Sequence, residues 1–490
     1  MAEHFDVLIV GAGISGIGAS YHLQRDCPNK SYVVLESHPE FGGTWWLHNY
    51  PGTRSDSDLY TFGYKFKPWT NAPIASRDEI LKYLGEVIED NDLGENIRYN
   101  HEIKTANWSD AEKKWTLTAV NKGTGDKIEI TCNFLWMCSG YYRHSEGYTP
   151  EWEGMSDFKG EVVHPQTWPE GLDYKYKNVV VIGSGATAAT LIPAMAEECK
   201  HITMLQRTPT YFIPGENKNE MADTLRSLDL PEEWVHEITR RKILQDSQMV
   251  TKLALDYPEE AKKELLKGVK EFLPNDFDVD KHLTPPYKPW TQRIAFVPEG
   301  DLFKDVAAGR ASIVTDHIER FTEKGILTKS GEEIEADIVI SATGFNLNAL
   351  GDVEFSVNGE SVEARDSYTW RGIMYSGIPN MVGIFGYLRT SWTMRSDLIC
   401  EFVMRLLKHM DEKDVEVVVP TLAASELQME TKPFIDPADF NSGYLQRGRE
   451  MMPKQGDRGP WTFSQDYYIE KDELPKIDLD QESLVYGAGK

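Results

Sequence analysis

The chain has 490 residues, and at roughly 150 residues per domain this length predicts two or three domains. Its 78 acidic residues outnumber its 52 Lys and Arg residues, so the formal net charge is −26 at pH 7. Such a charge disfavours nucleic acids and anionic membrane surfaces as partners, because both bind basic patches.

The cysteine content and the length of the apolar runs predict in which cellular compartment the protein lies. The five cysteines are scattered without a CxxC pair, which disfavours a disulfide framework or a metal site and fits a reducing cytoplasm. A strand that begins at Phe5 leaves no room for a signal peptide. Apolar runs stay shorter than the roughly 18 residues of a membrane-spanning helix, so we expect no integral membrane segment, while peripheral contact stays open.

The opening residues predict a strand, a glycine-rich turn, a helix and a second strand, in the order FDVLIV, GAGISG, IGASYHLQRD and SYVVLES. Gly11, Gly13 and Gly16 form the pattern GxGxxG, and Glu36 ends the second strand. The glycines let the backbone approach a pyrophosphate, the helix N-terminus faces the phosphates, and the acid accepts hydrogen bonds from ribose hydroxyls. This unit therefore predicts a dinucleotide site, with Ser15 in the phosphate loop.

The same pattern returns from Asn178 in the segments NVVVIG, SGATAATLIPAMAEE and HITMLQR. Here the strand after the turn ends in Arg207, where a guanidinium can hold a 2′-phosphate that an acid would repel. The second site is therefore predicted to prefer NADPH, with Thr208 assisting, and the first to hold FAD or, alternatively, NAD. The alternative for Arg207 is an ordinary surface arginine. The predicted contacts in the second turn, GxGxxA, are Gly183, Ser184, Gly185, Ala186, Thr187 and Ala188.

Two such units predict an α/β fold with two Rossmann-like dinucleotide-binding domains, one for FAD and one for NADPH. We assign residues 1–150 to the first part of the FAD-binding domain and residues 151–177 to a linker. Residues 178–335 form the NADPH-binding domain, with a helical insertion at about 216–283 where Glu, Lys and Leu recur at helical spacing. Residues 336–490 return to the FAD-binding domain and end in a tail.

The loop after the first unit limits which molecule can accept electrons from the flavin. A disulfide reductase needs a pair of redox-active cysteines beside its flavin, and the loop FGGTWWLHNYPGTRSDSD contains no cysteine. Oxygen is therefore the favoured acceptor of electrons that pass from NADPH to the flavin.

Several motifs resemble those of Baeyer–Villiger flavin monooxygenases. GGTWWLHNYPGTRSD (42–56) resembles the family pattern GGxWxxxxYPGxxxD, and FKGEVVHPQTWP (158–169) resembles the linker fingerprint FxGxxxHxxxWP. Glu170 stands where that fingerprint usually ends in Asp. EADIVISATGF is similar to the strand from which the chain returns to the FAD domain. Residues 285–303 and 386–398 most resemble the ethionamide-activating branch.

The resemblance implies an enzyme that uses NADPH and O2 to form a C4a-peroxyflavin, converts ketones to esters or lactones, and also oxidises sulfides. It implies that Arg293 is the arginine essential for oxygenation and that Asp56 holds it in place. Gln292 replaces a lysine of larger relatives, which leaves Arg207 more responsible for the phosphate of NADP. Further cofactor contacts implied for the flavin and its loop are Thr44, Trp45, Trp46, Leu47, Arg54, Ser55 and, for the adenine, Ile103.

Several residue roles stay open. The acids of RSDSD are alternatively caps for the helix that follows, and Asp58 is the better placed cap. Trp46 and Ile103 are alternatively core residues. His164, in the linker, either transmits domain motion through hydrogen bonds or is structural.

Two other functions stay open. One is a heteroatom-oxygenating flavin monooxygenase that acts on nitrogen or sulfur, and the other is a flavin-binding redox sensor without turnover. The Trp-Pro end of the linker and Arg293 weigh against the first. We expect the residues that line the substrate pocket to come from the helical insertion and from residues 388–394. The sequence carries no signal for an oligomeric state or for one particular ketone.

Overall fold

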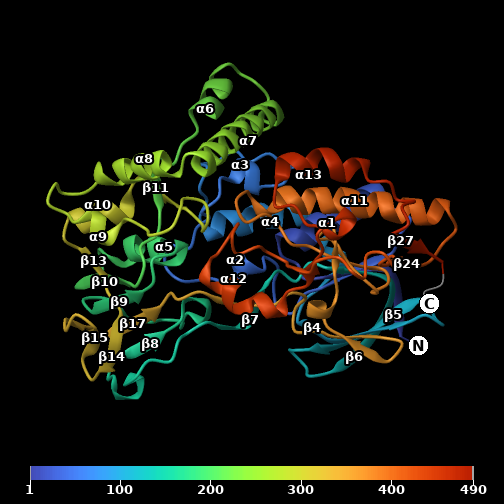
Figure 1. Ribbon diagram of the computed structural model, residues 1–490, viewed down its shortest axis with the longest axis horizontal. Helices are drawn as coiled ribbons and strands as arrows, with labels where there is room; N and C mark the ends of the chain where they lie inside the picture. Colours follow the sequence, from blue (N-terminus) through green and yellow to red (C-terminus); the bar gives the residue numbers. More distant parts are fainter. Residues whose placement is uncertain (1, 488–490) are drawn as a thin grey trace.

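The computed structural model describes residues 2–487 and contains two large sheets that lie side by side, each covered by helices (Figure 1). In the first sheet, β1 pairs in parallel with both β2 and β6 because its apolar run is buried at the sheet centre. The strand order is β20-β19-β4-β5-β6-β1-β2-β3, with β23 also on β6. The strands are β1 (Glu3–Val10), β2 (Tyr32–Leu35), β3 (Ile97–Arg98), β4 (His101–Ser109), β5 (Lys114–Asn121), β6 (Lys127–Met137), β19 (Glu354–Val357), β20 (Glu360–Val362) and β23 (Met381–Gly383).

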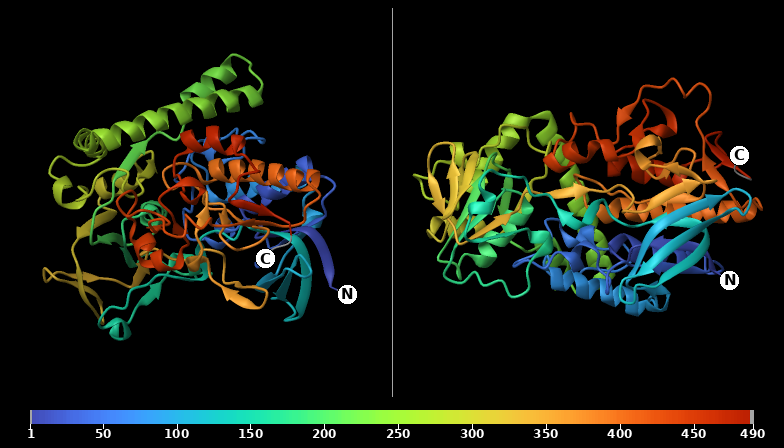
Figure 2. Two further views of the ribbon diagram at one scale, coloured as in Figure 1. Left: turned by 45° about the vertical axis from the view of Figure 1, so that its right-hand side comes forward. Right: turned by 90° about the horizontal axis from the view of Figure 1, so that it is seen from below.

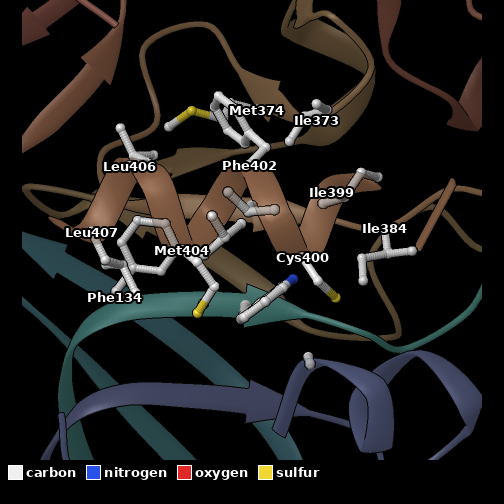
Figure 3. Close-up of a cluster of buried hydrophobic side chains, with 14 of the residues drawn as sticks. Phe134, Ile373, Met374, Ile384, Ile399, Cys400, Phe402, Met404, Leu406 and Leu407 are labelled. Carbon is white, nitrogen blue, oxygen red and sulfur yellow. The ribbon is translucent and has the colours of Figure 1, made fainter. Parts of the chain in front are cut away.

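The helices of this half are α1 (Ile14–Asp26), α2 (Thr44–Leu47), α3 (Leu59–Phe62), α4 (Arg77–Asp90) and α11 (Trp392–Glu412). Figure 3 shows how α11 packs on β6: Met404 and Leu407 lie on the side of Phe134, whereas Phe402 and Leu406 point to the opposite side, toward Met374. This apolar layer fixes the start of α11, and therefore Trp392, beside the first glycine turn.

The second sheet is entirely parallel, in the order β13-β10-β9-β17-β8. Its helices are α5 (Ala186–Met195) and α10 (Asp301–Ala307). Its strands are β8 (Glu161–Val163), β9 (Asn178–Ile182), β10 (His201–Gln206), β13 (Ala311–Thr315) and β17 (Ile338–Ser341).

The strand membership corrects one predicted domain limit. β17 is fully buried and pairs with β9, so the second unit continues beyond residue 336 and the return to the first sheet follows Ser341. An apolar four-residue strand needs neighbours on both edges, and β9 and β8 supply them. The predicted linker is also part of this sheet, because it contributes β8 as the edge strand.

The linker histidine lies where the chain crosses between the sheets through β7 (Tyr142–Gly147) and β18 (Phe345–Leu347), which pair with each other. Nε2 of His164 donates to Gly344 O at 3.1 Å, and Nδ1 accepts from the Gln166 amide at 3.1 Å. A Cβ atom on Gly147 would lie 1.9 Å from Cε1 of His164. Burial lowers the pKa of His164. His164 is therefore a neutral side chain that fastens the crossing strands.

The insertion after β11 (Phe212–Gly215) consists of four helices. They are α6 (Glu220–Ser227), α7 (Glu232–Asp256), α8 (Pro258–Lys270) and α9 (Val279–His282), and β12 (Ala295–Pro298) then pairs with β11. Of these helices, α6 and part of α7 stand away from the sheets (Figures 1 and 2), while α8 and α9 pack against the second sheet. Between residues 2 and 487, no helix is long and apolar enough to cross a membrane.

The remaining strands are short and pair outside the two large sheets. They are β14 (Ile318–Thr322), β15 (Gly325–Thr328), β16 (Glu333–Glu335), β21 (Thr369–Trp370), β22 (Met374–Tyr375), β24 (Val418–Pro420), β25 (Lys432–Pro433), β26 (Lys454–Gln455) and β27 (Leu484–Tyr486). The tail also contains α12 (Gly443–Gly448) and α13 (Tyr467–Glu473), and it folds back over the space between the sheets (Figure 1).

Candidate functional site

A cavity of about 670 Å³ lies where the two sheets and the tail meet. The first glycine turn, the loop after it, the second glycine turn and the tail all contribute to its wall. Sites of this kind form at the carboxyl ends of parallel strands, because the loops that follow the strands converge there.

The first turn forms one end of the cavity. Gly11 has a φ of +97°, and a Cβ atom on Gly16 would lie 1.8 Å from Gly11 O, so both positions require glycine. Gly13 is the N-cap of α1 and has no side chain with which to cap the helix, which leaves the first N–H groups of α1 for a ligand. Gly13 and Ser15 line the cavity, whereas Gly16 provides the close contact between turn and helix.

Glu36 lies beside this turn and is only 4% exposed. Its two oxygens accept hydrogen bonds from the backbone amides of Ala12 at 2.7 Å and His38 at 2.8 Å. Burial raises the pKa of Glu36, although those hydrogen bonds oppose the shift. The carboxyl is thereby fixed at the cavity wall, where a ribose would meet it.

Arg293 and Asp56 meet at the centre of the cavity wall from opposite halves of the molecule. Nε and Nη2 of Arg293 donate to Asp56 Oδ2 at 2.8 Å and Oδ1 at 2.9 Å. Nη2 also donates to Ser57 Oγ at 2.7 Å, and Nη1 donates to Leu388 O at 3.1 Å. The side chains remain 31% and 30% exposed, so the pair is fixed yet open to the cavity.

In the pair formed by Asp56 and Arg293, each charge stabilises the ionised form of its partner. Burial acts to raise the pKa of Asp56, but the adjacent Arg293 outweighs it and holds that pKa below its ordinary value. For Arg293, burial opposes the cationic form and Asp56 favours it, with a net rise in the pKa. The cavity therefore contains a permanent cation in one orientation.

The second turn reaches the cavity only in part. Gly185, Ala186 and Thr187 line it, and Gly185 is the N-cap of α5 without a capping side chain. Gly183 packs behind the turn, because a Cβ atom there would lie 2.3 Å from Ala342 O. Arg207 lies outside the cavity, exposed at the end of β10.

Comparisons with known proteins agree with this geometry. Residues 8–228 match a family model described as pyridine nucleotide-disulphide oxidoreductase. The chain is 45% identical over 488 residues to the FAD-containing monooxygenase EthA of Mycolicibacterium smegmatis, which covers 99% of this chain and 98% of the relative. It is 42% identical over 476 residues to the probable FAD-binding monooxygenase AlmA of an Acinetobacter species, which covers 97% and 94%. The chain belongs to the FAD-containing monooxygenase family.

Solved structures show the fold of this monooxygenase. An oxidized steroid monooxygenase bound to NADP superposes with a TM-score of 0.78 at 22% identity, over 99% of this chain and 100% of that chain. Cyclohexanone monooxygenase from Rhodococcus sp. Phi1 bound to NADP+ superposes with a TM-score of 0.76 at 21% identity, over 100% of both chains. The predicted α/β fold with two dinucleotide-binding units is confirmed, and so is the family recognised from its motifs.

The other predicted residues of the monooxygenase fall into two groups. Thr44, Trp45, Arg54 and Ile103 line the cavity. Arg54 also pairs with Asp301 of α10 at 2.5 Å, so it joins the two halves. Residues that lie behind the wall or away from it are Trp46, which packs on His38, Leu47, Ser55, Ser184, Ala188 and Thr208.

Of the two acids in the segment RSDSD, only Asp58 caps a helix. Asp58 is the N-cap of α3 and accepts a hydrogen bond from the Tyr60 amide at 2.8 Å, as predicted. Asp56 faces Arg293 instead of the helix. Two acids two residues apart therefore have different roles, because the turn between them points their side chains in different directions.

The sequence did not predict that three tyrosines line the cavity. Tyr141 and Tyr142 share a hydrogen bond of 2.7 Å between their hydroxyls, and Tyr444 of α12 packs against both rings. Burial raises the pKa of all three, so they remain neutral donors. Tyr141 and Tyr142 closely follow β6, and the position just after a parallel strand is a usable signal. No sequence signal could have identified Tyr444, since the tail lacks periodicity.

Of the two segments predicted to line the substrate pocket, one does line the cavity and the other does not. Leu388, Thr390 and Trp392 line the cavity from the predicted segment, and Trp392 Nε1 donates to Ser15 Oγ at 2.8 Å. Of the described residues that line the cavity, none comes from the helical insertion, so that part of the prediction is wrong. The tail contributes Phe440, Ser442 and Tyr444 to the cavity wall instead.

Proposed function

We propose that the chain is an NADPH- and O2-dependent Baeyer–Villiger monooxygenase that holds FAD, converts ketones to esters or lactones, and also oxidises sulfides. The observation that carries the proposal is the fixed Arg293 cation in a cavity that both dinucleotide turns reach. Relatives named as FAD-containing monooxygenases support the flavin, and fold neighbours bound to NADP support the coenzyme.

The residues at the first turn fit FAD. The uncapped start of α1 can accept a pyrophosphate, Glu36 stands where ribose hydroxyls would donate, and Ile103 lines the adenine end. Thr44 and Trp45 would then lie along the flavin. Bound FAD, once reduced by NADPH, would supply the activation of O2.

Arg293 supplies the charge that the reaction with a ketone requires. Negative charge develops on the carbonyl oxygen as that carbonyl is attacked, and a cation already oriented by Asp56, Ser57 and Leu388 stabilises it without reorganisation. The bidentate geometry matters, because a free arginine would have to be ordered in the transition state.

The second turn fits NADPH. Its uncapped helix start reaches the cavity at Gly185, and Arg207 lies farther out at the end of β10, where a 2′-phosphate would lie. This arrangement would place the nicotinamide end inside the cavity and the adenosine end at the surface.

The test is a panel of ketones and sulfides incubated with the FAD-loaded protein, NADPH and O2, with product masses determined. Esters or lactones from ketones are expected, together with sulfoxides from sulfides. Sulfoxides without any ester would favour heteroatom oxygenation and refute the ketone chemistry. NADPH oxidation that no organic substrate accelerates would favour a redox sensor.

A further inference from the structure

Two arginines that are far apart in sequence converge at the surface next to the second turn. Arg207 follows β10, and Arg447 belongs to α12 in the tail. Both are exposed, and neither forms an ion pair with any residue between 2 and 487. Acids are abundant in a chain of charge −26, yet no acid of the described residues pairs with either arginine.

The Arg447 side chain is held in place by the crossing strands. Its guanidinium lies 3.6 Å from the centre of the Tyr148 ring, and Nη2 donates a long hydrogen bond of 3.5 Å to Phe345 O. A Cβ atom on Gly344 would lie 3.2 Å from the same Nη2. Stacking fixes the plane of the guanidinium and leaves most of its N–H groups free to donate.

The segment under Arg447 is continuous with the second turn. Ala342 O touches Gly183 so closely that no side chain fits there. From the same turn, Ser184 Oγ donates to Thr208 O at 3.0 Å, directly after Arg207. The turn, the end of β10 and the support of Arg447 therefore form one surface.

The two guanidinium groups repel each other. Partial burial lowers the pKa of Arg447; the Tyr148 hydroxyl opposes this shift, and the neighbouring charge of Arg207 adds to it. Such a pair is unfavourable by itself and becomes favourable when an anion with several oxygens lies between the charges.

We propose that Arg447 and Arg207 together bind the 2′-phosphate of NADPH, so that the tail helps to select the coenzyme. The inference rests on the proposed use of NADPH. It also assigns the second phosphate contact that Gln292 does not provide, since Gln292 is uncharged and donates to Asn441 Oδ1 at 3.0 Å.

The site depends on tertiary contact, because α12 must stay docked on β18 to present Arg447. Figure 1 shows α12 in the middle of the molecule, between the two sheets. Coenzyme binding would therefore link the second sheet to the tail, which also supplies Tyr444 to the cavity wall.

The experiment is calorimetric titration of the FAD-loaded protein with adenosine 2′,5′-bisphosphate and with adenosine 5′-monophosphate. Arg447→Gln is expected to weaken binding of the bisphosphate roughly tenfold and to leave the monophosphate unchanged. Arg447→Lys should restore part of the loss. Arg449→Gln, an exposed neighbour in the same segment, is the matched control and should bind both as the wild type does.

The outcomes are separable. Equal weakening of both ligands in Arg447→Gln would mean that the arginine only supports the fold, and unchanged discrimination would place the phosphate elsewhere; either result overturns the inference and leaves NADPH in place. A wild type that binds both ligands equally would overturn the inference and the NADPH assignment together. Added salt should weaken the bisphosphate more in the wild type than in Arg447→Gln.

Discussion

The two glycine turns share a sequence pattern and differ in what surrounds them. At the first turn, Glu36 is buried and bound by backbone amides, and Trp392 closes over Ser15. At the second turn, Arg207 is exposed and only three turn residues reach the cavity. The same local structure can therefore enclose one ligand and leave another free to exchange.

The difference has a physical origin in the covering elements. The first turn is covered by α11, whose apolar side chains are buried against β6, and such a layer is costly to open (Figure 3). The second turn is approached by α12 of the tail, which bears the exposed Arg447. We therefore expect FAD to be retained and NADPH to exchange, and the following variants test that contrast.

The largest effect is expected where the two regions meet, at Arg293. Arg293→Ala removes the fixed cation from the cavity, and ester formation should fall at least about a hundredfold because charge on the carbonyl oxygen is no longer stabilised. Reduction of the flavin by NADPH, followed by its absorbance without O2, should continue. Ester formation at the wild-type rate would mean that another group supplies the charge.

The next effect concerns the enclosed site. Glu36→Ala leaves the amides of Ala12 and His38 without an acceptor and removes the partner of the ribose, so FAD affinity should drop roughly tenfold or more. The flavin-to-protein absorbance ratio after purification measures the loss. Glu40→Ala, an exposed acid nearby, is the control. Full flavin content in Glu36→Ala would contradict the assigned role.

At the open site, Arg207→Ala should lower the preference for NADPH over NADH about tenfold, with flavin content unchanged. The ratio of kcat/KM for the two coenzymes is the measurement. Arg320→Ala, on the exposed side of β14 in the same half, should leave that ratio as it is. An unaltered ratio in Arg207→Ala would show that the 2′-phosphate is bound by other residues.

The smallest effect is a pH dependence confined to the first region. Burial lowers the pKa of His48 to about 4, below its ordinary value of 6.5. The folded state therefore keeps His48 neutral. The stability that this provides is complete above pH 6.5 and is lost as the pH falls toward 4, by up to about 2 kcal/mol at pH 5.

Melting temperatures at pH 7.5 and pH 5 test this sign. His48→Asn, which can still donate to Thr44 O, should lose less stability on acidification than the wild type. His317→Asn, an exposed histidine of the other half, should follow the wild type. A His48→Asn variant as acid-sensitive as the wild type would exclude His48 as the cause.

The local patterns predicted much of the fold. Both strand–turn–helix units lie where the alternation of apolar runs and glycines placed them, because close packing at Gly11 and Gly16 is a property of adjacent residues. The Asp56–Arg293 contact was also expected, although only from the resemblance to a family. Strand order was not predictable, as β17 shows. Its sequence is suited to either sheet, and its pairing with β9 places it in the second sheet.

By itself the sequence determined the two dinucleotide units, the acid and the arginine that end their strands, and the motifs of the family. These depend on short-range geometry that a few neighbouring residues specify. The tertiary structure alone decided that the tail, and not the helical insertion, contributes to the cavity wall. It also decided that Tyr444 and Arg447 pack against Tyr141 and Tyr148, each about 300 positions earlier in the chain. Such contacts arise from packing of whole elements, which no local pattern encodes.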